Sequence, residues 1–188
     1  MKILLVVLGI LLLVGLMFAG KFVSVRNELA IQNEAIAGAW AQVDVALQRR
    51  ADLIPNLVST VKGFATHEQQ VIDSVTAARA ALGGARSPQE KIAANNQLDG
   101  AISRLLVISE NYPNLKSNEN FMRLQDELAG TENRIAVERR KYNEVVQRYN
   151  TQIALFPNNL IASMSGFQRN DAYFKTDPGS RVAPKVAF

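Results

Sequence analysis

An uninterrupted apolar stretch near the N-terminus constrains this chain more than any other feature of its sequence. Residues 3–20 read ILLVVLGILLLVGLMFAG, with Lys2 before them and Lys21 after them. As an α-helix the stretch is about 27 Å long, which is just enough to cross the hydrocarbon core of a bilayer. Ile3–Gly20 therefore predicts a transmembrane anchor, residues 1–21, that holds the chain in a lipid bilayer.

A cleaved signal peptide is the alternative interpretation of this stretch. Such a peptide has small residues at positions −3 and −1 of its cleavage site. Cleavage after Ala19 would place Met17 at −3, and cleavage after Gly20 would place Phe18 there. Both side chains are bulky, so the sequence favours an uncleaved, single-pass anchor.

The charges that flank the anchor give a weak orientation signal. Lys2 lies on one side, whereas Lys21 and Arg26 lie on the other. The positive-inside rule therefore favours, by one charge, a cytoplasmic location for the bulk of the chain.

The rest of the chain has the pattern of an all-α protein. Apolar residues recur at steps of three, four or seven from Val25 to Val61, and a similar stripe runs from Phe121 through Tyr142, Val145 and Tyr149 to Phe156. The chain has no cysteine and one histidine, which excludes disulfides and a cysteine nucleophile and argues against sites built from several histidines.

Four helices are predicted in a bundle domain over residues 22–156, at about 22–62, 67–82, 88–110 and 118–155. Thr66 precedes Gln69 at capping-box spacing, and Ser87-Pro88-Gln89-Glu90 is a stronger start signal. Short connections between them predict an up-and-down antiparallel four-helix bundle with long first and last helices. These two helices are expected to extend beyond the compact part as a two-helix stalk, and the first of them can continue from the anchor helix. Residues 157–188 predict a short helix near 158–166 and an irregular tail.

Two positions in the first long helix break its apolar pattern. Pro55 lacks an N–H group, so we expect a kink near Ile54 or a helix restart there. Arg50 falls on the apolar seam, where a buried guanidinium would need a carboxylate partner. Trp40 lies beside the seam, and we expect its side chain to pack against the core or a neighbouring helix.

Eight polar residues form the candidate set for partner binding or for a structural polar cluster. They lie around Pro55 and along the last long helix, and the sequence leaves both interpretations open. They are Arg49, Arg50, Asp52, Asn56, Glu132, Asn133, Tyr142 and Asn143.

The sequence offers little for catalysis. His67 has no convergent ligands near it in sequence, and no phosphate-binding loop, HExxH or GxSxG motif occurs. The basic run Arg139-Arg140-Lys141 is flanked by Glu138 and Glu144, which is weak support for nucleic-acid binding. We therefore predict no catalytic, cofactor-binding or metal-binding residues, no nucleic-acid partner and no small-molecule substrate.

Two long segments resemble the LemA family of bacterial membrane proteins. The first is AWAQVDVALQRRADLIPNLVSTVKGFATHE, residues 39–68, and the second runs from ENYPNLKSNENF to IASMSGF, residues 110–167. The resemblance also takes in the anchor and the closing Val186-Ala187-Phe188, whereas residues 83–100 match only loosely. It implies a helical bundle behind one transmembrane helix, in the bacterial cytoplasmic membrane with the bulk of the chain in the cytoplasm, and it supplies no catalytic residues.

Three functional hypotheses follow from the sequence. The first is a non-enzymatic membrane-anchored scaffold or adaptor that binds a protein partner. The second is a structural homo-oligomer that assembles on the membrane. The third, with the least support, is an enzyme that uses a metal held by His67 and carboxylates from another helix.

Overall fold

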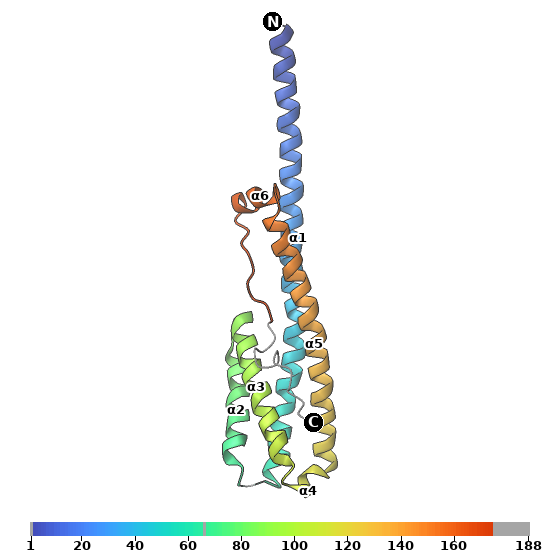
Figure 1. The fold of residues 1–188 in the computed structure, drawn as a ribbon, viewed down its shortest axis with the longest axis vertical. Coiled ribbons are helices and arrows are strands. Elements are labelled where there is room, and N and C mark those ends of the chain that lie inside the picture. Colours follow the sequence, from blue (N-terminus) through green and yellow to red (C-terminus); the bar gives the residue numbers. More distant parts are fainter. Residues whose placement is uncertain (1, 66, 175–188) are drawn as a thin grey trace, which may run out of the picture. The chain divides into compact units, whose positions relative to one another are not determined.

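The computed structural model describes residues 2–65 and 67–174, and every regular element in these ranges is a helix. Figure 1 shows the helices along the chain. They are α1 (Lys2–Lys62), α2 (Gln69–Gly84), α3 (Pro88–Ser109), α4 (Pro113–Lys116), α5 (Glu119–Ala154) and α6 (Asn158–Met164). The prediction of an all-α chain with a long apolar N-terminal helix is confirmed, and the up-and-down bundle arrangement stays a prediction.

The predicted helix ends agree with the observed ends of α2, α3 and α5 to within two residues. The one-turn helix α4 lies in the short connection between α3 and α5. The proposed cap at Thr66 and the tail from residue 175 lie outside the described residues. Helix α2 begins after Glu68, whose side chain makes no capping hydrogen bond.

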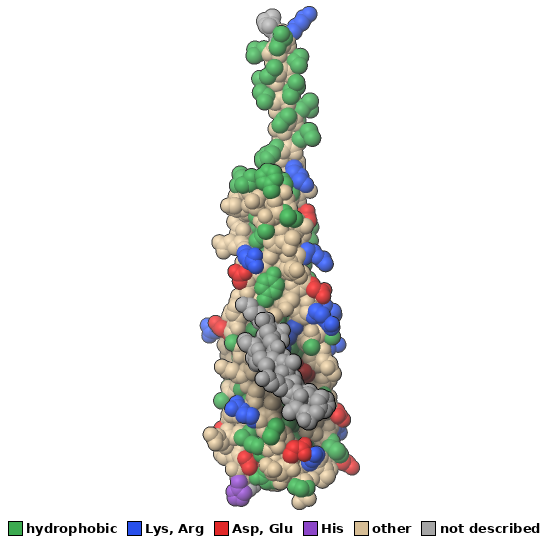
Figure 2. Space-filling model, in the orientation of Figure 1, with side chains coloured by type: hydrophobic (Ala, Val, Ile, Leu, Met, Phe, Trp, Pro, Cys, Tyr) green, Lys and Arg blue, Asp and Glu red, His purple; other side chains and the backbone are tan. Residues whose placement is uncertain are grey.

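Helix α1 runs without interruption from Lys2 through Pro55 to Lys62, so it contains both the predicted anchor and the predicted first long helix. The expected helix restart at Pro55 is therefore wrong. Within α1, the side chains of Ile3–Gly20 are all exposed, as Figure 2 shows for its hydrophobic side chains. Among the described residues, α1 is the one helix long and apolar enough to cross a membrane.

The chain divides into two compact units. The first unit consists of residues 1–39 and 142–171, and the second of residues 40–141 and 172–188. The core of the first unit contains Val25 and Leu29 of α1 and Ile161 and Ala162 of α6, with three partly buried residues packed around them: Phe22, Ile153 and Phe167.

The end of α6 explains how Phe167 reaches that core. Gly166 has a φ of 77°, a conformation that residues with a Cβ rarely adopt. The N–H of Phe167 donates to the carbonyl of Ala162 at 3.0 Å, and the N–H of Gly166 donates to that of Ser163 at 3.3 Å. This Schellman pattern reverses the chain and returns Phe167 to the helix that it has just left.

Two side chains of α5 hold the segment that follows α6. The hydroxyl of Tyr149 donates to the carbonyl of Gln168 at 2.9 Å. The amide of buried Asn150 both donates to the carbonyl of Asn170 and accepts from its N–H, at 2.7 and 2.9 Å. Hydrogen bonds from two α5 side chains thus hold the irregular segment 168–170 against the first unit.

The second unit is built from parts of α1 and α5 together with α2, α3 and α4. The predicted start of α3 is confirmed, because Ser87 and Glu90 form both hydrogen bonds of a capping box. The buried stripe of α1 is also as predicted, from Val43 to Val61. The largest fully buried side chains of this unit are Phe121, Leu47, Ile54, Leu57, Ile72, Leu98, Leu105, Leu115 and Ile135.

The stripe of α5 departs from the prediction at two positions. Val146 is fully buried, whereas Val145 is only partly so. Phe156 is 80% exposed, because α5 ends at Ala154 and the side chain lies beyond the helix. Both residues belong to the first unit.

Candidate functional site

A buried ionic cluster joins three helices of the second unit. Arg50 on α1 is 5% exposed, and its guanidinium forms ion pairs with Asp99 on α3 and Glu132 on α5. The expectation that Arg50 is buried beside a carboxylate is thereby confirmed. The two carboxylates offset the cost of removing the guanidinium from water, and they link α1 to two other helices.

A second arginine extends this cluster toward aromatic side chains. Arg139 on α5 lies 3.6 Å from a carboxylate oxygen of Asp99, and its guanidinium lies 5.0 Å from the centre of the Phe174 ring. Phe174 stacks on Trp40 of α1, with ring centroids 5.9 Å apart. Both ring contacts are favourable when partly desolvated. Trp40 is therefore a packing residue, and its ring partner comes from the C-terminal segment.

The pKa of Asp99 is raised from its ordinary value of 3.8, chiefly because burial disfavours the charged carboxylate. The guanidinium of Arg50 opposes this shift, while the nearby carboxylate of Glu132 adds to it. With two guanidiniums facing two carboxylates, the cluster has little net charge to offer a ligand. Its geometry therefore points to a structural role.

Pro55 leaves a carbonyl oxygen of α1 without its usual donor. In an uninterrupted helix the carbonyl of Ala51 would accept a hydrogen bond from the N–H of residue 55, which proline lacks. Arg79 on α2 donates its Nε–H to that oxygen at 2.9 Å. Because Ala51 is buried, this hydrogen bond satisfies a group that water reaches poorly.

The structure separates the eight candidate polar residues. Arg50 and Glu132 meet in the ionic cluster, whereas Tyr142 and Asn143 belong to the first unit. The four that remain lie on the surface of the second unit: Arg49, Asp52, Asn56 and Asn133. The candidate set therefore contains residues that support the fold and residues that are open to a partner.

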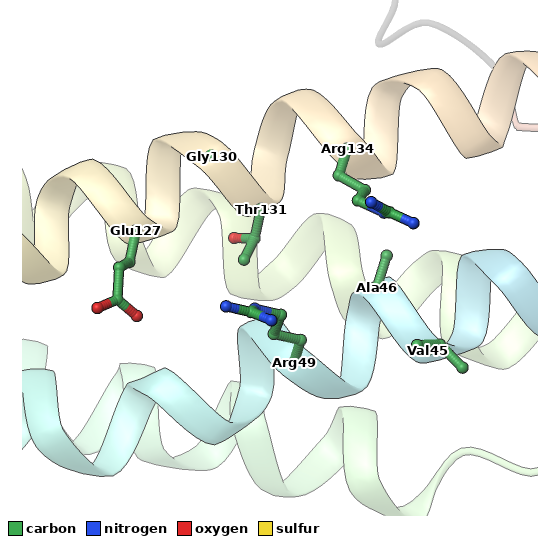
Figure 3. Close-up of a pocket in the computed structure, with 7 residues that line it drawn as sticks. All are labelled: Val45, Ala46, Arg49, Glu127, Gly130, Thr131 and Arg134. Carbon is green, nitrogen blue, oxygen red and sulfur yellow. The ribbon is translucent and has the colours of Figure 1, made fainter.

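A groove of about 520 Å³ between α1 and α5 makes one of these exposed residues a candidate for binding. Its lining residues are Val45, Ala46, Arg49, Glu127, Gly130, Thr131 and Arg134. Figure 3 shows that the side chains of Arg49, from α1, and Arg134, from α5, extend into the space between the helices. Neither guanidinium forms an ion pair with another described residue, so both can pair with an incoming anion.

Three residues with roles in these contacts escaped the sequence analysis: Asp99, Arg79 and Arg134. Arg139 was noted only as part of a basic run, and not as a partner of Asp99. A signal existed for two of the three. Asp99 directly follows the core residue Leu98, and Arg79 is a lone charge in a run of small apolar residues. Arg134 gave no such signal, because it is one of several charged residues in the stretch 132–141.

His67 does not form a metal site with the other described residues. His67 is exposed, and no group of three His, Cys, Asp or Glu side chains that could hold a metal ion occurs among the described residues. Its neighbour Glu68 accepts a hydrogen bond from the hydroxyl of Tyr112 at 2.8 Å, which raises the pKa of that tyrosine.

Comparison with known proteins gives one family. The model of the LemA family matches residues 39–188. The magnetosome protein MamQ 2 of Paramagnetospirillum magneticum is 24% identical over 178 residues, an alignment that covers 81% of this chain and 65% of MamQ 2. Protein LemA of Metamycoplasma hominis is 25% identical over 180 residues, covering 94% of this chain and 80% of that protein. This chain thus spans about two thirds of the length of its MamQ relatives.

Proposed function

Because the chain belongs to the LemA family, we propose that it is a non-enzymatic, single-pass membrane scaffold or adaptor that docks a partner protein in the α1–α5 groove. The observation that carries this proposal is the continuity of α1. One uninterrupted helix contains both the apolar segment Ile3–Gly20 and the groove residue Arg49. A docked partner would therefore be tethered to the bilayer through one continuous helix.

The side chains of the groove support a partner that carries an acidic segment. Arg49 and Arg134 extend into the groove from opposite helices, and Glu127 is the one carboxylate among the lining residues. Arginine guanidiniums recognise carboxylates through paired hydrogen bonds. Val45, which is 67% exposed, supplies an apolar contact beside them.

The bulk of the chain lies on the cytoplasmic side in this proposal, with the up-and-down bundle predicted from the sequence as its body. The charge difference across the anchor supports that orientation, and the ion pairs that join α1, α3 and α5 support the bundle.

Site-specific photocrosslinking in bacterial cells tests the docking surface. A photoreactive phenylalanine analogue at Val45 should capture a discrete partner from the groove. Reversing both charges, Arg49→Glu with Arg134→Glu, should reduce that capture at least tenfold, because each acidic contact becomes repulsive.

Arg140→Glu is the matched control, since Arg140 is exposed on α5 and does not line the groove. It should leave the crosslinked product unchanged, and all variants should keep the same helical CD spectrum. Undiminished capture by the charge-reversed groove would rule out this docking site.

A structural homo-oligomer is the second candidate function. It is favoured by large apolar side chains that α1 leaves exposed beyond the anchor, such as Ile31 at 70% and Val45 at 67%. Light scattering of the full chain in mild detergent measures the molar mass. A defined oligomer that dissociates in Ile31→Lys or Val45→Lys would favour this candidate, whereas a monomer would exclude it.

A further inference from the structure

Helix α6 has an apolar surface that the first unit does not cover. Ile161 and Ala162 are buried against Val25 and Leu29 of α1. Leu160 and Met164 lie four residues apart on another face of α6, and they are 56% and 73% exposed.

The turn before α6 continues this apolar surface. Leu155 and Phe156 follow the end of α5, and they are 51% and 80% exposed. We call the four side chains the α6 patch: Leu155, Phe156, Leu160 and Met164. Figure 2 shows hydrophobic side chains gathered beside α1 at the level of α6 in Figure 1.

The sequence around the α6 patch contains no charge. Residues 149–168 include no Asp, Glu, Lys or Arg, although a fifth of the whole chain is charged. A water-exposed turn between two helices would ordinarily carry charged side chains, as helix surfaces in this chain do elsewhere. Four exposed large apolar side chains without a charge among them indicate a surface that is covered in use.

The position at which α6 packs on α1 indicates what covers the α6 patch. Phe22 and Val25 contact the α6 core two and five residues after Gly20, where the apolar anchor segment ends. At 1.5 Å per residue these contacts lie about 3–8 Å beyond the hydrocarbon, within the headgroup layer of a bilayer. Ile153, near the end of α5, packs against the same core, and the turn at 155–156 follows it directly in the chain.

We propose that the α6 patch is a second membrane contact, and that its side chains enter the boundary between headgroups and acyl chains of the leaflet that α1 leaves. This inference rests on the membrane anchor of the proposed function. Helix α6 has one polar exposed face, at Asn159 and Ser163, and one apolar exposed face, as an interfacial helix requires. Lys21 and Arg26 of α1 lie at the same level and can pair with anionic headgroups.

The absence of cysteine makes the depth of each side chain measurable in the full chain. Single cysteines at Phe156, Leu160 or Met164 carry a nitroxide label, and each protein is reconstituted in phosphatidylcholine–phosphatidylglycerol vesicles. Collision rates with oxygen, which concentrates in lipid, and with a water-soluble nickel chelate then report depth. Labels in the α6 patch should collide more with oxygen than with nickel.

Three further labels give the reference values. Ser163→Cys, on the polar face of α6, should collide with nickel more often than Met164→Cys does. Gln147→Cys, exposed on α5, should report water, and Val14→Cys, within the anchor, should report the hydrocarbon core.

The outcomes separate the two proposals. Water-like values throughout the α6 patch with a lipid-like value at Val14 would overturn the second contact and leave the anchor in place. Water-like values at Val14 as well would overturn both. Labels in the patch that are shielded from both reagents, with spin–spin broadening that unlabelled protein removes, would show that a second copy covers the patch and would also overturn the inference.

Discussion

Arg50 is the residue whose loss should cost the second unit most. Arg50→Ala removes the cation that Asp99 and Glu132 share and leaves both carboxylates in a partly buried space. Breaking such a buried pair should lower the unfolding free energy by about 3 kcal/mol. Chemical unfolding of the full chain in mild detergent, followed by CD, measures the loss.

Arg49→Ala is the matched control for that variant. Arg49 is the exposed neighbour of Arg50, so its loss should change the unfolding free energy by less than about 0.5 kcal/mol. Equal small effects of the two substitutions would contradict a structural role for the ionic cluster.

Asp99 should make the folded chain less stable as the pH rises. Its pKa is raised in the folded state, so the folded chain keeps a proton that the unfolded chain has already released. The resulting stabilisation is complete below the ordinary pKa of 3.8 and is lost as the pH rises through the raised value.

Asp99→Asn cannot titrate, and it isolates this contribution from those of the other carboxylates. The unfolding free energy of the unmodified chain minus that of the variant should fall with pH above 3.8 and then level off. A difference that increases with pH would mean that Arg50 outweighs burial at this carboxyl.

Arg79 and Pro55 should be energetically coupled. The Nε–H of Arg79 satisfies the Ala51 carbonyl only because Pro55 lacks the helical donor. Arg79→Ala should therefore cost about 1–2 kcal/mol in the unmodified chain and clearly less in Pro55→Ala. A double-mutant cycle from unfolding curves measures the difference, and additive effects would contradict the assignment.

At the residue scale the sequence predicted burial better than it predicted partners. A lone arginine on an apolar seam has to be paired, which identified Arg50. Its partner Asp99 lies 49 positions away on α3, and the periodicity of one helix does not contain the register between helices. The role of Arg79 could not be predicted for the same reason. Pro55 showed that the Ala51 carbonyl lacks its helical donor, but not which residue replaces that donor.

At the element scale, Gly166 decides how α6 ends. An alanine at a φ of 77° is strained, and Gly166→Ala should lower the unfolding free energy by about 1 kcal/mol. Gly100→Ala is the control, since a Cβ there meets nothing within 4 Å and alanine favours helix. Opposite signs are expected in thermal unfolding, and a loss in both variants would argue against the Schellman ending.

The helices themselves were largely predictable, because their signals are local. Ser87 and Glu90 cap α3 as the sequence indicated, and apolar periodicity located α5. The course of α1 through Pro55 was not predictable, since the donor that satisfies Ala51 comes from another helix. The exposure of Phe156 was missed because the stripe was extended two residues beyond the end of α5.

At the scale of the whole molecule, the apolar segment and the long family-like motifs predicted an all-α membrane protein of the LemA family. The α1–α5 groove was not predictable, because it depends on which residues of two distant segments face each other. The proposed functions divide in the same way: membrane attachment was predicted from one segment, whereas the proposed docking surface depends on how two helices pack.

The central claim is that α1 is both the membrane anchor and a wall of the helical body. Alkaline carbonate extraction of bacterial membranes tests it most directly, because it releases proteins that do not span the bilayer. The unmodified chain and Ile31→Arg should stay in the membrane pellet. Leu12→Arg with Gly15→Arg adds two charges to the span, each costing about 3 kcal/mol, and should release the chain with its helical CD signal largely retained. Release of the unmodified chain, or retention of the doubly charged variant, would contradict the account.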